Sequence, residues 1–110
     1  MRILHLTTFL QGGAGLAITS LASAQARAGH AVTVLTSGTG VPGYGNYPAY
    51  LGALAAAGVR TAVVDSLFDR RPEAHAPVAR CLDVDLGGAA AFDLLHAHAA
   101  VPSALARAAV

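Results

Sequence analysis

Three glycines near the amino end of the chain could place backbone amides around an anion. The segment Gly12-Gly13-Ala14-Gly15 lies between an apolar run that predicts a strand and an alanine-rich stretch that predicts a helix. Free amides at a helix N-terminus, with the helix dipole behind them, favour phosphates and other anions. Glycines there let a ligand approach the backbone closely. We therefore expect Gly12, Gly13 and Ala14 to face an anion, and a plain tight turn is the alternative.

The glycines fit neither of two common nucleotide-binding patterns. A dinucleotide fingerprint that starts at Gly13 needs a small residue at position 18, where Ile18 stands. The acidic residue that should follow the second strand is also missing, because Thr36-Ser37-Gly38 occupies that place. A Walker loop requires a lysine, and the chain contains none. NAD is therefore disfavoured, and a Walker loop is excluded.

Two histidines separated by one residue offer a second kind of chemistry. His96 and His98 fall at the end of a predicted strand, where residues two apart point to the same side. Neither a carboxylate nor a third histidine adjoins them in the sequence, so we expect no metal ion. His98, closer to the carboxyl end of the strand, is expected to contact a ligand, and His96 to be structural. His5, inside the first strand, is expected to be buried and hydrogen-bonded.

Further candidates lie in the loops and in one helix. Tyr44, Asn46 and Tyr47 follow the second strand, where aromatic and amide groups suit sugars or polar rings. A loop that is anchored by two aromatic side chains is an equally good interpretation. Arg70-Arg71 could meet an anion, although a solvated pair is the commoner arrangement. Cys81 has no neighbouring base in its predicted helix, so we expect it to fill apolar space.

Strands and helices alternate along the chain. Runs that are apolar on both faces predict buried strands at residues 2–8 and 31–36, and two further strands are predicted at residues 59–64 and 93–97. The intervening patterns predict helices at residues 14–28 and 48–57, within 73–86, and from residue 102 onward. Gly29, Gly58 and Gly87-Gly88 are expected to end helices. Pro77 must lie in the first turn of its helix, because an interior proline costs about 3 kcal/mol. Residues 37–47 predict a long loop.

This order predicts an α/β fold. Helical crossovers between strands imply a Rossmann-like parallel sheet with helices on both faces and right-handed connections. The simplest strand order is 3-2-1-4, which opens a crevice above the carboxyl ends of strands 1 and 4. The glycine segment and His98 should therefore meet at one crevice. The outer edge of strand 4 is unpaired in this arrangement, so we expect the isolated chain to self-associate.

The composition limits the class of protein. The chain has 110 residues, a net charge of +1 and 55% hydrophobic residues, which predict a single folded domain without the basic surface that nucleic acid requires. One cysteine excludes an internal disulfide and is typical of the cytoplasm. The start of the chain has some features of a signal peptide, but polar residues and glycines interrupt its apolar run. No apolar stretch approaches the roughly 18–20 residues of a membrane span.

Three landmarks, in order along the chain, resemble one enzyme family. The chain starts with MRILHLTTFLQGGAG, Gly29-His30 precedes the second strand, and Asp93, His96 and His98 form an Asp-x-x-His-x-His motif. Together they resemble the N-terminal domain of group 1 GT-B glycosyltransferases, which are retaining enzymes of carbohydrate biosynthesis that use nucleotide sugars. The similarity is strong at both ends of the chain and weak between residues 38 and 91.

The resemblance implies two Rossmann-like domains that face a cleft, with residues 1–110 forming an incomplete N-terminal, acceptor-side domain. It assigns the donor's diphosphate to Gly12, Gly13 and Ala14, and it places His98 on the acceptor side. Asn46 and Tyr44 are our further candidates for acceptor binding. The family's C-terminal donor domain is absent from residues 1–110, so no catalytic residue is named and the 110-residue chain alone is expected to be inactive.

The expected partners follow from the same resemblance. They are a nucleotide-sugar donor, which is a substrate rather than a cofactor, and a sugar, lipid or small-molecule acceptor. No metal cofactor and no nucleic acid are expected, and peripheral membrane association stays open. The alternative function is a non-catalytic module with a Rossmann-like fold that binds a nucleotide or a sugar phosphate in the same crevice.

Overall fold

A parallel sheet forms the centre of the fold in a computed structural model that describes residues 1–38 and 42–109. Its strands are β1 (Arg2–Leu6), β2 (Ala31–Ser37), β3 (Arg60–Val64) and β4 (Leu94–Ala97), in the order β3-β2-β1-β4. All three pairings are parallel. The predicted Rossmann-like fold and strand order are therefore confirmed. Residues 39–41 of the predicted loop and residue 110 of the predicted last helix lie outside the described residues.

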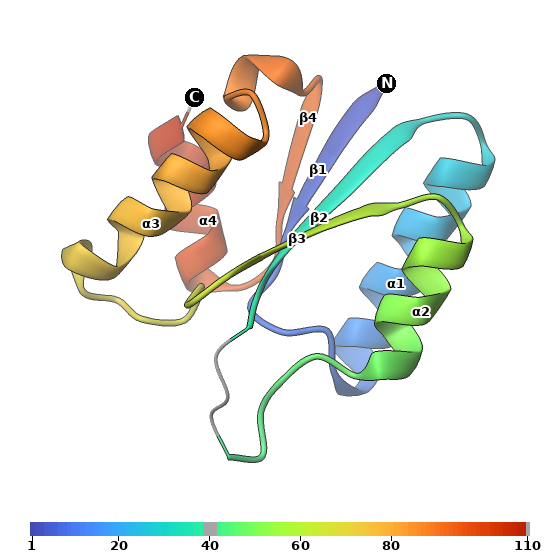
Figure 1. Cartoon of the computed structure of the whole chain (residues 1–110), viewed down its shortest axis with the longest axis horizontal. Helices are drawn as coiled ribbons and strands as arrows, with labels where there is room; N and C mark the ends of the chain where they lie inside the picture. Colours follow the sequence, from blue (N-terminus) through green and yellow to red (C-terminus); the bar gives the residue numbers. More distant parts are fainter. Residues whose placement is uncertain (39–41, 110) are drawn as a thin grey trace.

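Helices cover both faces of the sheet, as the strand order predicts (Figure 1). One face carries α1 (Gly12–Arg27) and α2 (Pro48–Ala56), and the other carries α3 (His75–Arg80) and α4 (Ala100–Ala109). Alternate residues of β1 and β2 supply the two cores. The first core includes Ile3, Ile18, Val32, Val34 and Leu54. The second includes Leu4, Leu6, Leu35, Val78, Leu82 and the predicted filler Cys81.

The start of α1 differs from the prediction in a way that matters for the site. The helix begins at Gly12 rather than at residue 14, so the first glycines form its first turn. The Gly15 N–H donates to the Gln11 carbonyl at 2.9 Å, which closes that turn. A Cβ at Gly15 would lie 2.7 Å from the carbonyl carbon of Leu10, so only glycine lets the helix pack against the preceding segment. Low helix propensity of glycine suggested a loop, and packing overrides that propensity here.

The third crossover is less regular than predicted. A 3₁₀ turn at Pro72–Ala74 precedes α3, and a turn of π-helix at Cys81–Asp85 follows it. Pro77 lies in the first turn of α3, as expected from its missing N–H. A further 3₁₀ turn at Ala89–Ala91 leads into β4 and was not predicted. Gly29 and Gly58 follow α1 and α2 with φ of +98° and +82°, which confirms them as helix terminators.

Candidate functional site

A pocket of about 770 Å³ opens at the carboxyl edge of the sheet, where segments that follow all four strands converge. Its walls come from the segment after β1 (Thr7, Thr8, Phe9, Gln11), from α1 (Ala14, Ala17, Ile18, Leu21), and from Tyr44, Phe68 and His98. Ala14 of the first turn of α1 and His98 therefore share one pocket, as the strand order predicts, whereas Gly12 and Gly13 do not line it. Most of the wall is apolar, which is typical of small-molecule sites.

The first turn of α1 presents backbone amides that no side chain caps within the described residues. Gln11 is the N-cap residue, but its side-chain oxygen accepts from the Gly45 N–H at 3.0 Å instead. The first turn also contains no acidic residue. The amides of Gly12, Gly13 and Ala14 precede the first N–H that bonds within the helix. This end of the helix is consequently positive and suited to an anion.

An aromatic group borders the pocket, and the sequence predicted only one of its members. Phe9 stacks on Phe68 with ring centroids 5.5 Å apart, and Tyr44 lies 6.4 Å from Phe9. Tyr44 is 59% exposed, so its ring is accessible to a ligand. Phe9 and Phe68 were missed, although each follows the carboxyl end of a strand. That position, shared with Tyr44, is the signal that could have identified them.

Asn46 stands beside the pocket rather than in its wall. Its Oδ1 accepts from the Leu10 N–H at 2.8 Å and from the Thr36 hydroxyl at 2.9 Å, and its Nδ2 donates to the Ser37 carbonyl at 2.6 Å. These bonds join the segment before α1 to the end of β2. The side chain therefore holds the pocket's framework, and its contact with an acceptor stays a prediction. Tyr47 packs against Tyr50, with centroids 5.3 Å apart, away from the pocket wall.

His98 is the histidine that reaches the pocket, and His96 does not line it. The two rings stack with centroids 4.2 Å apart, which confirms that they lie on one side of the strand. His5 is fully buried, and its two ring nitrogens contact Gln25 and His98. Burial, followed by repulsion from His96 and His5, lowers the pKa of His98 to about 4. At neutral pH the ring is uncharged and can exchange a hydrogen bond with a ligand.

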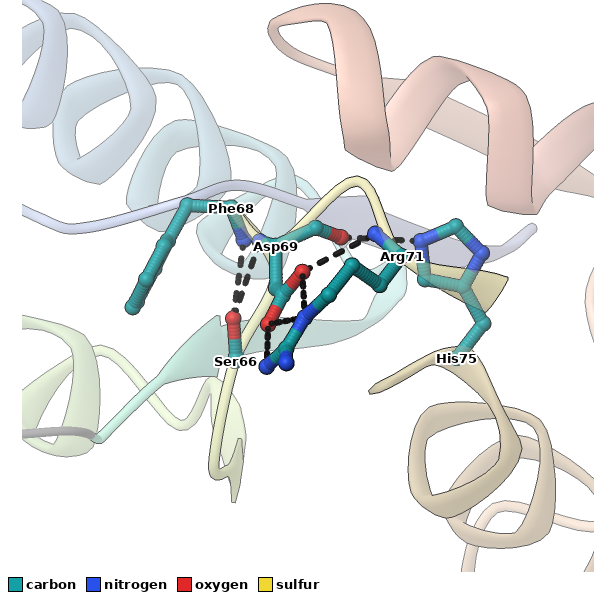
Figure 2. A network of polar contacts seen from close by, with 5 residues as sticks. All are labelled: Ser66, Phe68, Asp69, Arg71 and His75. Carbon is teal, nitrogen blue, oxygen red and sulfur yellow. Dashed lines mark hydrogen bonds and ion pairs between the residues drawn. The ribbon is translucent and has the colours of Figure 1, made fainter. Parts of the chain in front are cut away.

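The loop after β3 positions Phe68 through a compact polar network (Figure 2). The Ser66 hydroxyl accepts from the N–H of Phe68 and of Asp69, at 3.3 and 3.0 Å. The Arg71 guanidinium contacts the Asp69 carboxylate at 2.6 Å and holds the pKa of that carboxyl at about 2. The His75 ring bonds the Asp69 carbonyl at 2.9 Å. Arg71 is therefore engaged within its own loop, and both Arg70 and Arg71 are exposed, as the solvated interpretation of the pair expects.

Asp93, the first residue of the histidine motif, lies at the opposite end of the sheet from the pocket. Its carboxylate accepts from the Arg2 backbone N–H at 2.7 Å and pairs with the Arg2 guanidinium at 3.0 Å. The hydrogen bond from the Arg2 guanidinium is the largest of the causes that lower the pKa of Asp93 to about 2. Asp93 consequently joins the starts of β1 and β4, and the motif combines a structural acid with a histidine at the pocket.

Comparison with known proteins gives one match. The model of a family described as Glycosyltransferase Family 4 matches residues 11–110, which include the start of α1, most of the pocket wall and the histidine motif. No curated protein and no solved structure matches the chain. Among the helices that the structure describes, none combines the length and the apolar character needed to cross a membrane.

Proposed function

The chain belongs to Glycosyltransferase Family 4 as an N-terminal domain of the GT-B type, and from this premise we propose that it takes part in retaining sugar transfer from a nucleotide sugar to an acceptor. The observation that carries the proposal is the shared pocket. Ala14 of the uncapped first turn of α1 lines it, and so do His98, which follows β4, and Tyr44, which lies in the loop after β2. Donor and acceptor groups would meet between them.

The amides of Gly12, Gly13 and Ala14 would act on the donor's diphosphate. Negative charge grows on the leaving diphosphate as the sugar bond breaks, and fixed N–H dipoles stabilise that charge without rearranging. Loss of one such donor typically lowers the rate by about 10²–10³-fold. Because no acidic side chain stands in the first turn, nothing there competes with the ligand's charge.

His98, Tyr44 and Asn46 would serve the acceptor side. His98 is uncharged at neutral pH, since its pKa is lowered to about 4, so it would bind an acceptor hydroxyl by hydrogen bonding. Tyr44 offers an exposed ring that can pack on a sugar or on an apolar group. Asn46 would hold the rim and present its remaining amide hydrogen. A sugar, a lipid or another small molecule fits these requirements.

The second candidate function is a non-catalytic module that binds a nucleotide or a sugar phosphate. The observation in its favour is that the described pocket wall contains neither Asp nor Glu. We assign no catalytic residue within the described part of the chain, and we propose no metal ion or other cofactor for the transfer. Incubation of the complete protein with UDP- and GDP-sugars separates the two functions, because only an enzyme releases or transfers the sugar.

Substitution of Gly13 tests the role of the first turn. A Cβ at this position meets no atom within 4 Å, so Gly13→Asp introduces a charge with its Cβ in open space. The new carboxylate also interacts favourably with the helix dipole, so the fold should be retained. We expect Gly13→Asp to abolish sugar transfer and calorimetric binding of inorganic pyrophosphate, whereas the neutral isostere Gly13→Asn retains both. Equal turnover of the two variants would remove the first turn from the mechanism.

A further inference from the structure

Three histidines come together beside the pocket, although the sequence shows only two of them as neighbours. His5 of β1 stands opposite His96 of β4 in the register of the sheet, and His98 follows on the same side. One ring nitrogen from each histidine lies within 4.8 Å of the others. His5 and His98 are 93 residues apart in the chain, so only the pairing of β1 with β4 creates the group.

We propose that His5, His96 and His98 bind one transition-metal ion of the Zn²⁺ class. Zn²⁺ binds histidine nitrogens at about 2.0–2.1 Å, so two ligands of a tetrahedral ion lie about 3.3 Å apart. The His5 Nδ1 and the His98 Nε2 are 3.2 Å apart, which already fits that spacing. His96 is less buried than His5 and has room to turn its nitrogen toward the same point.

The chemistry of the ligands selects the metal. Three imidazoles without a carboxylate suit Zn²⁺, Co²⁺, Ni²⁺ and Cu²⁺, whereas Mg²⁺ and Ca²⁺ prefer oxygen ligands. A site with three protein ligands leaves a position for water or for another ligand. His98 also lines the pocket, so an ion held here lies next to the space that we assign to the acceptor.

A hydrogen bond between His5 and Gln25 of α1 supports the proposed metal site. The His5 Nε2–H donates to the Gln25 Oε1 at 2.8 Å, which leaves the lone pair on Nδ1 facing His98. Metal-binding histidines commonly donate their second ring N–H to a carbonyl or carboxylate in this way. Burial lowers the pKa of both His5 and His98, which favours the uncharged rings that metal binding requires.

The inference goes beyond the proposed function, because the transfer step uses no metal there. It also revises the expectation from the sequence, which counted two histidines and predicted no metal ion. An ion at this place would bridge β1 and β4, and it should therefore stabilise the folded chain.

Metal titration of the chelator-treated protein tests the site. We expect calorimetry to show one Zn²⁺ per chain, and Co²⁺ to give the visible absorption of a tetrahedral complex. His96→Asn and His98→Asn should each weaken Zn²⁺ binding at least about 100-fold, which exceeds the usual loss from an outer-shell change. His30→Asn is the matched control, since His30 lies outside the group, and it should bind like the unmodified protein.

Two further measurements keep the test independent of folding defects in the histidine variants. Gln25→Leu leaves all three ligands in place and should weaken Zn²⁺ binding about 10–100-fold. Zn²⁺ should raise the Tm of the unmodified protein and leave that of His98→Asn unchanged. The proposal is overturned if the unmodified protein binds Zn²⁺ no more tightly than the His96→Asn/His98→Asn double variant. Loss of pyrophosphate binding in Gly13→Asp bears only on the proposed function, so failures of the two proposals are distinguishable.

Discussion

The polar groups at the two ends of β1 and β4 differ in what they contact: at one end they pair with each other, and at the other they face a pocket. At the amino end, Arg2 and Asp93 satisfy each other through a guanidinium–carboxylate pair and a backbone bond. At the carboxyl end, the first turn of α1 has no side-chain cap within the described residues, and His98 faces a pocket. Polar groups that pair internally hold the sheet together, whereas those that face a cavity are available to a ligand. One motif, from Asp93 to His98, contains both kinds.

The largest loss of stability is expected from a substitution that adds a side-chain atom at the start of α1, at the carboxyl end of the sheet. Gly15→Ala places a Cβ 2.7 Å from the Leu10 carbonyl carbon and 3.0 Å from the Tyr50 ring, so the start of α1 must shift. Overpacking of this kind costs about 1–3 kcal/mol of unfolding free energy. We expect urea denaturation to show that loss, together with weaker pyrophosphate binding as the amides move.

Gly13→Ala is the matched control for Gly15→Ala. Its Cβ meets no atom within 4 Å, and alanine gains up to about 1 kcal/mol over glycine in a helix. The two substitutions should therefore change stability in opposite directions although they lie two residues apart. If both destabilise the protein equally, the contact between Gly15 and Leu10 does not govern the start of α1.

The convergence of the loops at the carboxyl end could be predicted from the sequence. Runs that are apolar on both faces indicated the first two strands, and Gly29 and Gly58 marked where helices stop. Parallel order then placed the glycines and His98 at one edge without any knowledge of contacts. These features are local, or they follow from a general rule of α/β folds, so one sequence suffices.

Other parts of the site depend on pairings that no local pattern reveals. His5 joins His98 only through the register of β1 with β4. Phe68 reaches the pocket because Ser66 and the Asp69–Arg71 pair fix its loop. Glycine's low helix propensity concealed that α1 begins at Gly12, because tertiary packing decides that boundary.

An effect of intermediate size is expected from His98, at the carboxyl end, on how the stability of the protein depends on pH. The pKa of His98 in the folded chain is about 4, below the ordinary histidine value of 6.5, so the unfolded chain binds the proton more tightly. Stability should therefore fall as pH decreases from about 6.5 to about 4. His98→Gln should make this fall shallower by about 1 kcal/mol, a figure reduced for partial exposure of the ring. Urea denaturation across this pH range measures it, and identical profiles for both proteins would contradict the assignment.

The smallest effect is expected at the amino end, where the ion pair is exposed to solvent. Asp93→Asn removes the charge but keeps an oxygen that can accept from the Arg2 N–H, so stability should decrease less than in Gly15→Ala. The pKa of Asp93 in the folded chain is about 2 and the ordinary value for aspartate is 3.8, so its contribution to stability is present above pH 3.8 and is lost as pH falls toward 2. Added salt should shrink the difference between Asp93→Asn and the unmodified protein, because it screens exposed charges. Asp93→Ala removes the acceptor as well and should retain a deficit at high salt. A deficit of equal size and salt dependence in both variants would mean that charge alone joins the two strands, and that the backbone bond adds nothing at this end of the sheet.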